Sequence, residues 1–160
     1  MTHTLQSLAA QSKRVLSEDS GPAGRTRVAG LLSAALRDDA FLRDVFAKPV
    51  GERQVVYEDA GLGFCILAHE YPVAREGKPH DHGPSWAIYG QAEGESVMNE
   101  FDVVAPGKVK KSRSVVLRPG DAYVYNEGVI HAVTHAGSTR LVRIEGMDLA
   151  KVKRGVYALE

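Results

Sequence analysis

The residues of this sequence that are best suited to chemistry are histidines. The chain has six of them, and two, His80 and His82, are separated by a single residue. Alternate side chains of a β-strand point to the same face, so both imidazoles of such a pair can reach one ion. His131 and His135 lie on a later β-rich run, where they again share a face. Because imidazole binds iron, zinc, copper and nickel, the spacing predicts a site for a divalent metal ion.

The residues around the first pair resemble a motif of the cupin superfamily. That motif reads Gly, five residues, His-x-His, three or four residues, Glu, six residues, Gly. His80, His82 and Gly94 match it, whereas Ala74 stands at the first glycine and Ala87 stands at the glutamate.

A second motif of the same family comes later in the chain, in the correct order. It reads Gly, five residues, Pro-x-Gly, two residues, His, three residues, Asn. Gly120, Gly128 and His131 match it, Asn126 replaces the proline, and His135 replaces the asparagine. The family resemblance implies a double-stranded β-helix, also called a jelly roll.

The resemblance covers about residues 54 to 146 and implies a metal site formed by His80, His82 and His131 alone, because Ala87 occupies the place of the glutamate ligand. Three neutral imidazoles do not cancel the charge of the ion, and positions on one side stay open for water, substrate and dioxygen. The arrangement resembles the three-histidine iron oxygenases of the superfamily, among them the β-diketone-cleaving dioxygenase and, loosely, the cysteine dioxygenase-like proteins.

Two departures separate the chain from cysteine dioxygenase. Tyr57-Glu58-Asp59 stands where the resemblance implies an arginine that holds the substrate carboxylate. The Ser-x-His-x-Tyr triad of that enzyme has no counterpart, because the region reads Val142-Arg143-Ile144-Glu145-Gly146. The thiol substrate is therefore disfavoured.

Four further side chains are candidates for roles beside the metal. His135 is a candidate catalytic group, acting as a fourth ligand, a proton shuttle or a partner of the ligands. Tyr89 is expected to face inward and is the other candidate catalytic group, through a hydrogen bond to a bound oxygen atom. Arg140 and Arg143 face opposite sides of a late strand; either one binds an acidic substrate, or both belong to a salt-bridged outer face. Packing in the core or on the surface is the alternative for His135 and Tyr89.

The first third of the chain is expected to be helical. Apolar residues recur at helical spacing over residues 5–16 and 28–36. Asp38-Asp39 can cap a third short helix that carries the apolar residues of 41–46. This N-terminal helical segment, residues 1–50, is expected to pack on the β-rich remainder of the chain or on a second subunit.

The pattern of residue types changes from Gln54 onward. Short β-rich runs alternate with Gly, Pro and Asp, which is typical of a sandwich or a barrel. We therefore predict an all-β fold over residues 51–160, a double-stranded β-helix or jelly-roll cupin barrel, with the N-terminal helical segment packed on it.

Composition excludes several classes of partner. Lys plus Arg is 20 and Asp plus Glu is 20, so the basic excess typical of nucleic-acid binders is absent. No apolar run approaches the ~18 residues that would span a bilayer, and the N-terminus lacks the pattern of a secretion signal. A single cysteine, Cys65, excludes an intramolecular disulfide and fits a reducing cytoplasm. We expect a cytoplasmic protein that forms a homodimer through edge strands.

The sequence thus predicts a metal-dependent oxidoreductase of the dioxygenase type, with Fe(II) at His80, His82 and His131 and with Zn, Ni or Mn as alternatives. Its partners would be dioxygen and a small polar organic substrate, with His135 and Tyr89 acting on the bound molecules. Two alternatives stay open at this point. One is another metal-dependent cupin enzyme, such as an isomerase, a lyase or a hydrolase, and the other is a non-catalytic metal-containing binding or sensor module.

Overall fold

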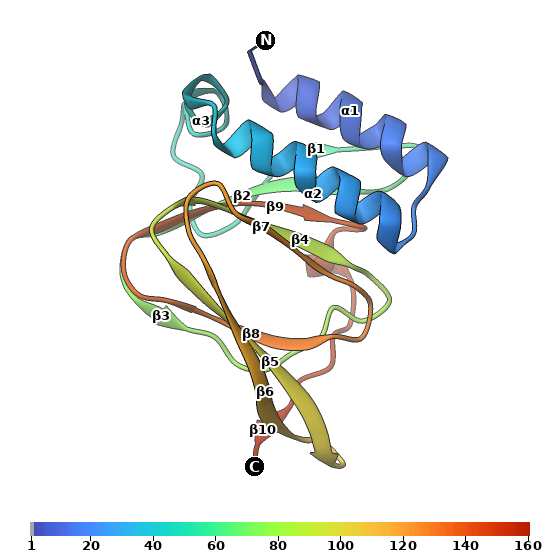
Figure 1. Cartoon of the computed structure of the whole chain (residues 1–160), viewed down its shortest axis with the longest axis vertical. Helices are drawn as coiled ribbons and strands as arrows, with labels where there is room; N and C mark the ends of the chain where they lie inside the picture. Colours follow the sequence, from blue (N-terminus) through green and yellow to red (C-terminus); the bar gives the residue numbers. More distant parts are fainter. Residues whose placement is uncertain (1) are drawn as a thin grey trace.

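Three α-helices precede the β-structure in the computed structural model, which describes residues 2–160 (Figure 1). The helices are α1 (Leu5–Glu18), α2 (Pro22–Leu36) and α3 (Asp39–Val45). Asp38 caps α3 as the sequence predicts, since its carboxylate accepts a hydrogen bond of 2.9 Å from the backbone nitrogen of Ala40. No helix of residues 2–160 is long and apolar enough to cross a membrane.

The strands form two five-stranded sheets. One sheet has the order β1-β2-β9-β4-β7 and the other has the order β10-β6-β5-β8-β3. Only the pairing of β10 with β6 is parallel among the strand pairs of residues 2–160. The strand bounds are β1 Gln54–Glu58, β2 Cys65–Tyr71, β3 Arg75–Glu76, β4 Ala87–Glu93, β5 Ser96–Ala105, β6 Lys108–Leu117, β7 Ala122–Tyr125, β8 Ile130–His135, β9 Thr139–Glu145 and β10 Ala158–Leu159.

This strand order is that of a jelly roll. In one sheet β9 returns between β2 and β4, and in the other β8 returns between β3 and β5, so late strands insert between early ones. Two such Greek keys in facing sheets define the double-stranded β-helix. The predicted β-helix is therefore confirmed, and so is a helical start of the chain. The class is mostly β rather than all-β, because three α-helices form part of the structure.

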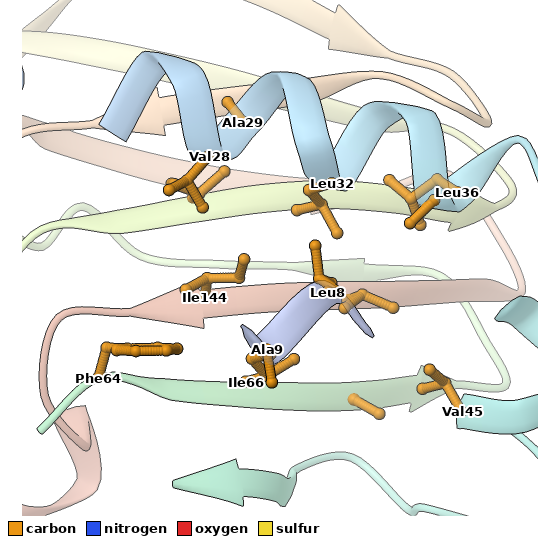
Figure 2. Packing of buried hydrophobic residues seen from close by; sticks show 14 of the residues in the cluster. Leu8, Ala9, Val28, Ala29, Leu32, Leu36, Val45, Phe64, Ile66 and Ile144 are labelled. Atoms are coloured by element: carbon orange, nitrogen blue, oxygen red, sulfur yellow. The ribbon is translucent and has the colours of Figure 1, made fainter. Parts of the chain in front are cut away.

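The helices cover the outer face of the sheet that contains β2, β9 and β4 (Figure 1). Figure 2 shows Val28, Leu32 and Leu36 of α2 pointing toward this sheet, whose strands contribute Ile66 and Ile144 to the same buried cluster. Each fully buried aliphatic side chain of this kind stabilises the fold by about 1.5–3 kcal/mol. The outer face of this sheet is therefore part of the main apolar core.

Close contact between α2 and β4 depends on a glycine. A Cβ atom at Gly90 would lie 2.7 Å from Leu32 and 2.8 Å from Leu36, and 2.8 Å from the backbone oxygen of Val142. Only a residue without a side chain lets the helix settle at this distance from the sheet.

The inner face of the same strands has a different character. On β4, Ile88 belongs to the outer core, whereas Ala87 and Tyr89 belong to a second cluster inside the barrel. On β9, Ile144 is in the outer core, whereas Arg143 lines an internal cavity. Strand alternation thus places polar side chains of these strands inside the barrel.

Candidate metal centre

His80 and His82 lie on an extended segment between β3 and β4, outside the named strands. The prediction that they share a regular strand is therefore wrong, although their rings still lie 5.5 Å apart, centre to centre. His80 is held against β8 by two backbone hydrogen bonds with His131, of 3.0 Å and 2.9 Å. This isolated bridge brings the first histidine motif next to the second.

The three predicted ligands meet in space. One ring nitrogen from each of His80, His82 and His131 lies within 4.8 Å of the other two. His131 is fully buried, His82 is 1% exposed and His80 is half-buried. Among residues 2–160 this is the group of His, Cys, Asp and Glu side chains close enough to hold a metal ion. His135 lies outside it, so the described geometry does not make His135 a fourth ligand.

Backbone carbonyls fix the tautomers of two of these histidines. Nδ1 of His80 lies 2.8 Å from the oxygen of Lys78, and Nδ1 of His131 lies 3.2 Å from the oxygen of Val129. A carbonyl oxygen only accepts, so each Nδ1 carries the proton and each Nε2 keeps its lone pair. Two nitrogens of the cluster are therefore prepared to donate to a cation.

His82 supplies a further sign that the residues fit an ion. Its Nδ1 is buried and has no hydrogen-bond partner among residues 2–160. A buried polar atom in that condition costs about 1–3 kcal/mol, which an ion or another bound group at the ring would offset. Together, these three adjacent imidazoles form a donor set that suits a divalent transition metal.

Burial keeps the three imidazoles neutral. It is the largest cause of the lowered pKa of each ring, and it brings the pKa of His131 to about 3. Repulsion between protonated rings acts in the same direction, since His80 lowers the pKa of His131 and His131 lowers the pKa of His82. Neutral imidazole is the form that binds metal, so the cluster is ready for an ion at neutral pH.

Tyr89 brings a hydroxyl group into the cluster. Its Oη lies 3.2 Å from Nε2 of His131 and 3.3 Å from Nε2 of His82, and it accepts a 2.7 Å hydrogen bond from Nη1 of Arg143. Burial raises the pKa of Tyr89, although the charge of Arg143 opposes this. The hydroxyl therefore keeps its proton and directs it toward the histidines.

No carboxylate of residues 2–160 joins the three histidines in place of the glutamate that the sequence motif would supply. Glu145 lies across from Ala87 in the β4–β9 pairing and is fully buried. One of its oxygens lies 3.0 Å from Arg53 and the other lies 3.1 Å from Nε of Arg143. Because both oxygens face arginines, this carboxylate neutralises cations of the barrel and does not join the histidines.

Arg143 and Arg140 separate as strand alternation predicts. Arg140 pairs with Glu70 and Glu93 at 3.1 Å and 3.2 Å, which fits the salt-bridged outer face. Arg143 instead points into the barrel, where its side chain is only 13% exposed. The prediction of an outer face is therefore wrong for Arg143.

His135 lines a cavity of about 190 Å³ that also borders His80, Tyr89 and Arg143. Its Nδ1 lies 2.8 Å from Oγ of Ser96, and its ring stacks on Tyr71 at 4.6 Å. Burial lowers the pKa of His135 to about 4, with the charge of Arg75 as the second cause. The ring is a neutral group in the wall of the cavity beside the cluster.

Two residues of the site were not found from the sequence. Tyr125 stacks on His131 with ring centres 4.0 Å apart and planes within 6° of each other. The only local signal for it is its spacing from Tyr123, which places both rings on one face of β7. Arg154, from the segment before β10, borders the same cavity as His80. No local pattern marks it, because its position depends on the path of the C-terminal segment.

No protein-family model and no curated protein matches the sequence. Solved structures with a similar fold include a cupin superfamily protein from Desulfitobacterium hafniense, with 17% identity, a TM-score of 0.47, and coverage of 60% of this chain and 76% of that one. A cupin-2 domain protein from Shewanella frigidimarina has 16% identity, a TM-score of 0.49, and coverage of 64% and 89%. Oxalate oxidase has 19% identity, a TM-score of 0.49, and coverage of 70% and 57%. At these values we base the fold class on the strand order and the site on its own geometry.

Proposed function

We propose that this chain is a metal-dependent enzyme in which His80, His82 and His131 bind one divalent ion inside the barrel. The observation that carries the proposal is the convergence of three neutral, mostly buried imidazoles whose donor atoms lie within 4.8 Å of one another. Such a group stabilises a fold poorly by itself, because polar atoms are buried without full hydrogen bonding. An ion at the three nitrogens removes that cost.

We further propose that the ion is Fe(II) and that the reaction is that of a dioxygenase-like oxygenase with a small polar organic substrate. When bound, Fe(II) supplies Lewis-acid and redox chemistry at the histidines. The support is the donor set: no carboxylate of residues 2–160 belongs to the cluster, so the protein leaves the charge of the ion for substrate to balance. The cavity beside His80 and Tyr89 provides space for that molecule.

The side chains around the cluster have assigned roles in this proposal. Tyr89 holds a proton at Oη and donates it as a hydrogen bond to an oxygen atom bound near His82 and His131. Arg143 fixes the position of that hydroxyl through its 2.7 Å hydrogen bond. His135 is neutral at pH 7 because burial lowers its pKa, so its ring can accept a proton from a molecule in the cavity that it lines.

Elemental analysis after anaerobic reconstitution with Fe(II) tests the metal site. We expect close to one iron per chain in the wild type and its loss in His82→Ala. His3→Ala is the matched control, because His3 pairs with Asp38 on the helical side of the molecule and its variant should keep the iron. A wild type that retains no metal under any loading condition would refute the proposal.

Dioxygen uptake tests the type of reaction. A panel of small polar compounds is offered to the iron-loaded wild type, and consumption of dioxygen that requires a particular compound supports an oxygenase. Turnover at the same rate under argon would instead favour an isomerase, a lyase or a hydrolase. Tight metal retention without turnover of any compound would favour a binding or sensor module.

A further inference from the structure

The cavity beside the histidine cluster is strongly basic. Its lining, as far as residues 2–160 form it, includes Arg75, Arg143 and Arg154 and no carboxylate. Its volume is about 190 Å³, which corresponds to about six water molecules at about 30 Å³ each. The cavity therefore suits a molecule of roughly six to ten non-hydrogen atoms.

The carboxylates of the protein neutralise the positive charges of these three arginines only in part. Arg143 pairs with Glu145, and Arg53, which also approaches that carboxylate, has a second partner in Asp148 at 2.7 Å. Arg75 pairs at 2.9 Å with Glu52, a side chain that is largely exposed. Arg143 therefore has a carboxylate partner inside the barrel, whereas the charge of Arg75 is balanced only by an exposed side chain.

Arg154 is the least compensated of the three. It forms no ion pair within the part of the chain that the structure describes. It borders the same cavity as His80, Tyr89 and Arg143. A divalent ion at the histidines would add to the same excess, since they bring no negative charge.

A second cavity, of about 290 Å³, adjoins the first. The two share Tyr71, Arg75, Arg143 and Arg154 in their walls. Arg75 and Arg154 are exposed, whereas Arg143 is mostly buried. The second cavity is lined by four arginines and two glutamates, Glu52 and Glu145, so positive charge is in excess along its wall. Such an excess raises the local concentration of anions.

We propose that Arg143 and Arg154, with Arg75 at the mouth, bind the carboxylate of a small organic acid whose other end lies at His80 and Tyr89. A carboxylate matches the planar fork of a guanidinium and accepts from two of its nitrogens at once. In Arg143, Nη1 donates to Tyr89 and Nε faces Glu145, and Nη2 has no hydrogen-bond partner among residues 2–160. That nitrogen and the guanidinium of Arg154 are the donors left for a ligand.

The inference deepens the proposed function by naming the class of substrate, and it is tested without measuring turnover. Isothermal titration calorimetry compares L-lactate with L-lactamide, which has nearly the same shape and no charge, on Zn(II)-loaded and on metal-free protein. We expect lactate to bind about tenfold or more tightly than lactamide, as a charge-assisted hydrogen bond would provide. Equal affinity for the two compounds would overturn the proposal, and so would tighter binding of inorganic phosphate than of lactate.

Substitutions distinguish the contribution of the arginines to lactate binding from that of the metal ion. Arg154→Gln should weaken lactate binding about tenfold and leave lactamide binding unchanged, whereas Arg118→Gln, at an exposed arginine paired with Glu95, should change neither. Equal effects of the two variants would overturn the proposal. Because Arg154 is exposed, its variant should fold normally; Arg143→Lys, which keeps the charge and loses the planar fork, is the second variant and should also weaken lactate binding.

The same measurements distinguish this inference from the proposed function. If the metal site fails, the protein binds no ion, yet metal-free wild type still prefers lactate to lactamide. If the carboxylate site fails, Zn(II) binds with one-to-one stoichiometry and the preference is missing.

Discussion

The two faces of the sheet β1-β2-β9-β4-β7 carry opposite chemistry on the same strands. On β9, Ile144 packs under the helices, while its neighbours Arg143 and Glu145 lie inside the barrel. On β4, Ile88 and Tyr89 divide in the same way. The outer face is an apolar core that needs no specific partner, whereas the inner face is a set of polar groups that must satisfy one another. We infer that the outer face stabilises the fold through burial of apolar side chains, whereas the inner face depends on paired charges and contains the candidate metal centre.

The largest loss of stability is expected from Glu145→Gln, which removes a buried negative charge inside the barrel and keeps the size of the side chain. The change leaves Arg143 and Arg53 near each other without the shared carboxylate. Removing one partner of a buried ion pair costs about 3–5 kcal/mol. Urea unfolding of the metal-free protein measures the loss. Arg140→Gln, in a half-exposed pair, is the control and should cost about 1 kcal/mol or less; similar losses in the two variants would contradict the contrast between the faces.

A comparable but slightly smaller loss of stability is expected from Leu32→Ala on the outer face. Leu32 is fully buried between α2 and the sheet, and truncating such a leucine costs about 2–5 kcal/mol. Leu62→Ala, at a side chain that is 44% exposed, should change the free energy of unfolding by about 0.5 kcal/mol or less. The folded Leu32→Ala protein should still bind one metal ion per chain. A loss of metal stoichiometry in the folded variant would show that the two faces are not separable.

The smallest expected effect is on the pH dependence of stability, and it tests whether His135 on the inner face is buried as a neutral ring. The folded-state pKa of His135 is lowered to about 4 from 6.5, so the unfolded chain binds a proton at higher pH than the folded one. The contribution of His135 to stability is therefore complete above about pH 6.5 and is lost as the pH falls to about 4. Its size is at most about 3 kcal/mol. Free energies of unfolding of metal-free protein at pH 7, 5.5 and 4.5 should fall less steeply in His135→Asn than in the wild type. Equal slopes would mean that His135 titrates normally.

Local patterns were sufficient for much of the fold. Helical spacing and the cap at Asp38 depend on neighbouring residues, and both were predicted correctly. The order of the two histidine motifs indicated the jelly roll and grouped His80, His82 and His131, which do converge in the folded chain. The strand around His80 was not predicted correctly, because the backbone there pairs with His131 and Val156 in isolated bridges and not in a regular ladder.

The sequence by itself therefore determined the helical start, the β-rich body, the glycine and proline turns and the three histidines. Only the tertiary structure decided which face of each strand became the interior. The helices cover the outer face of β9, so most of its residues are buried on both sides, and the usual alternation of apolar and polar residues does not mark the solvent side. For the same reason the meeting of Arg75, Arg143 and Arg154 was not visible in the sequence: pairings between distant segments bring these charges to one cavity.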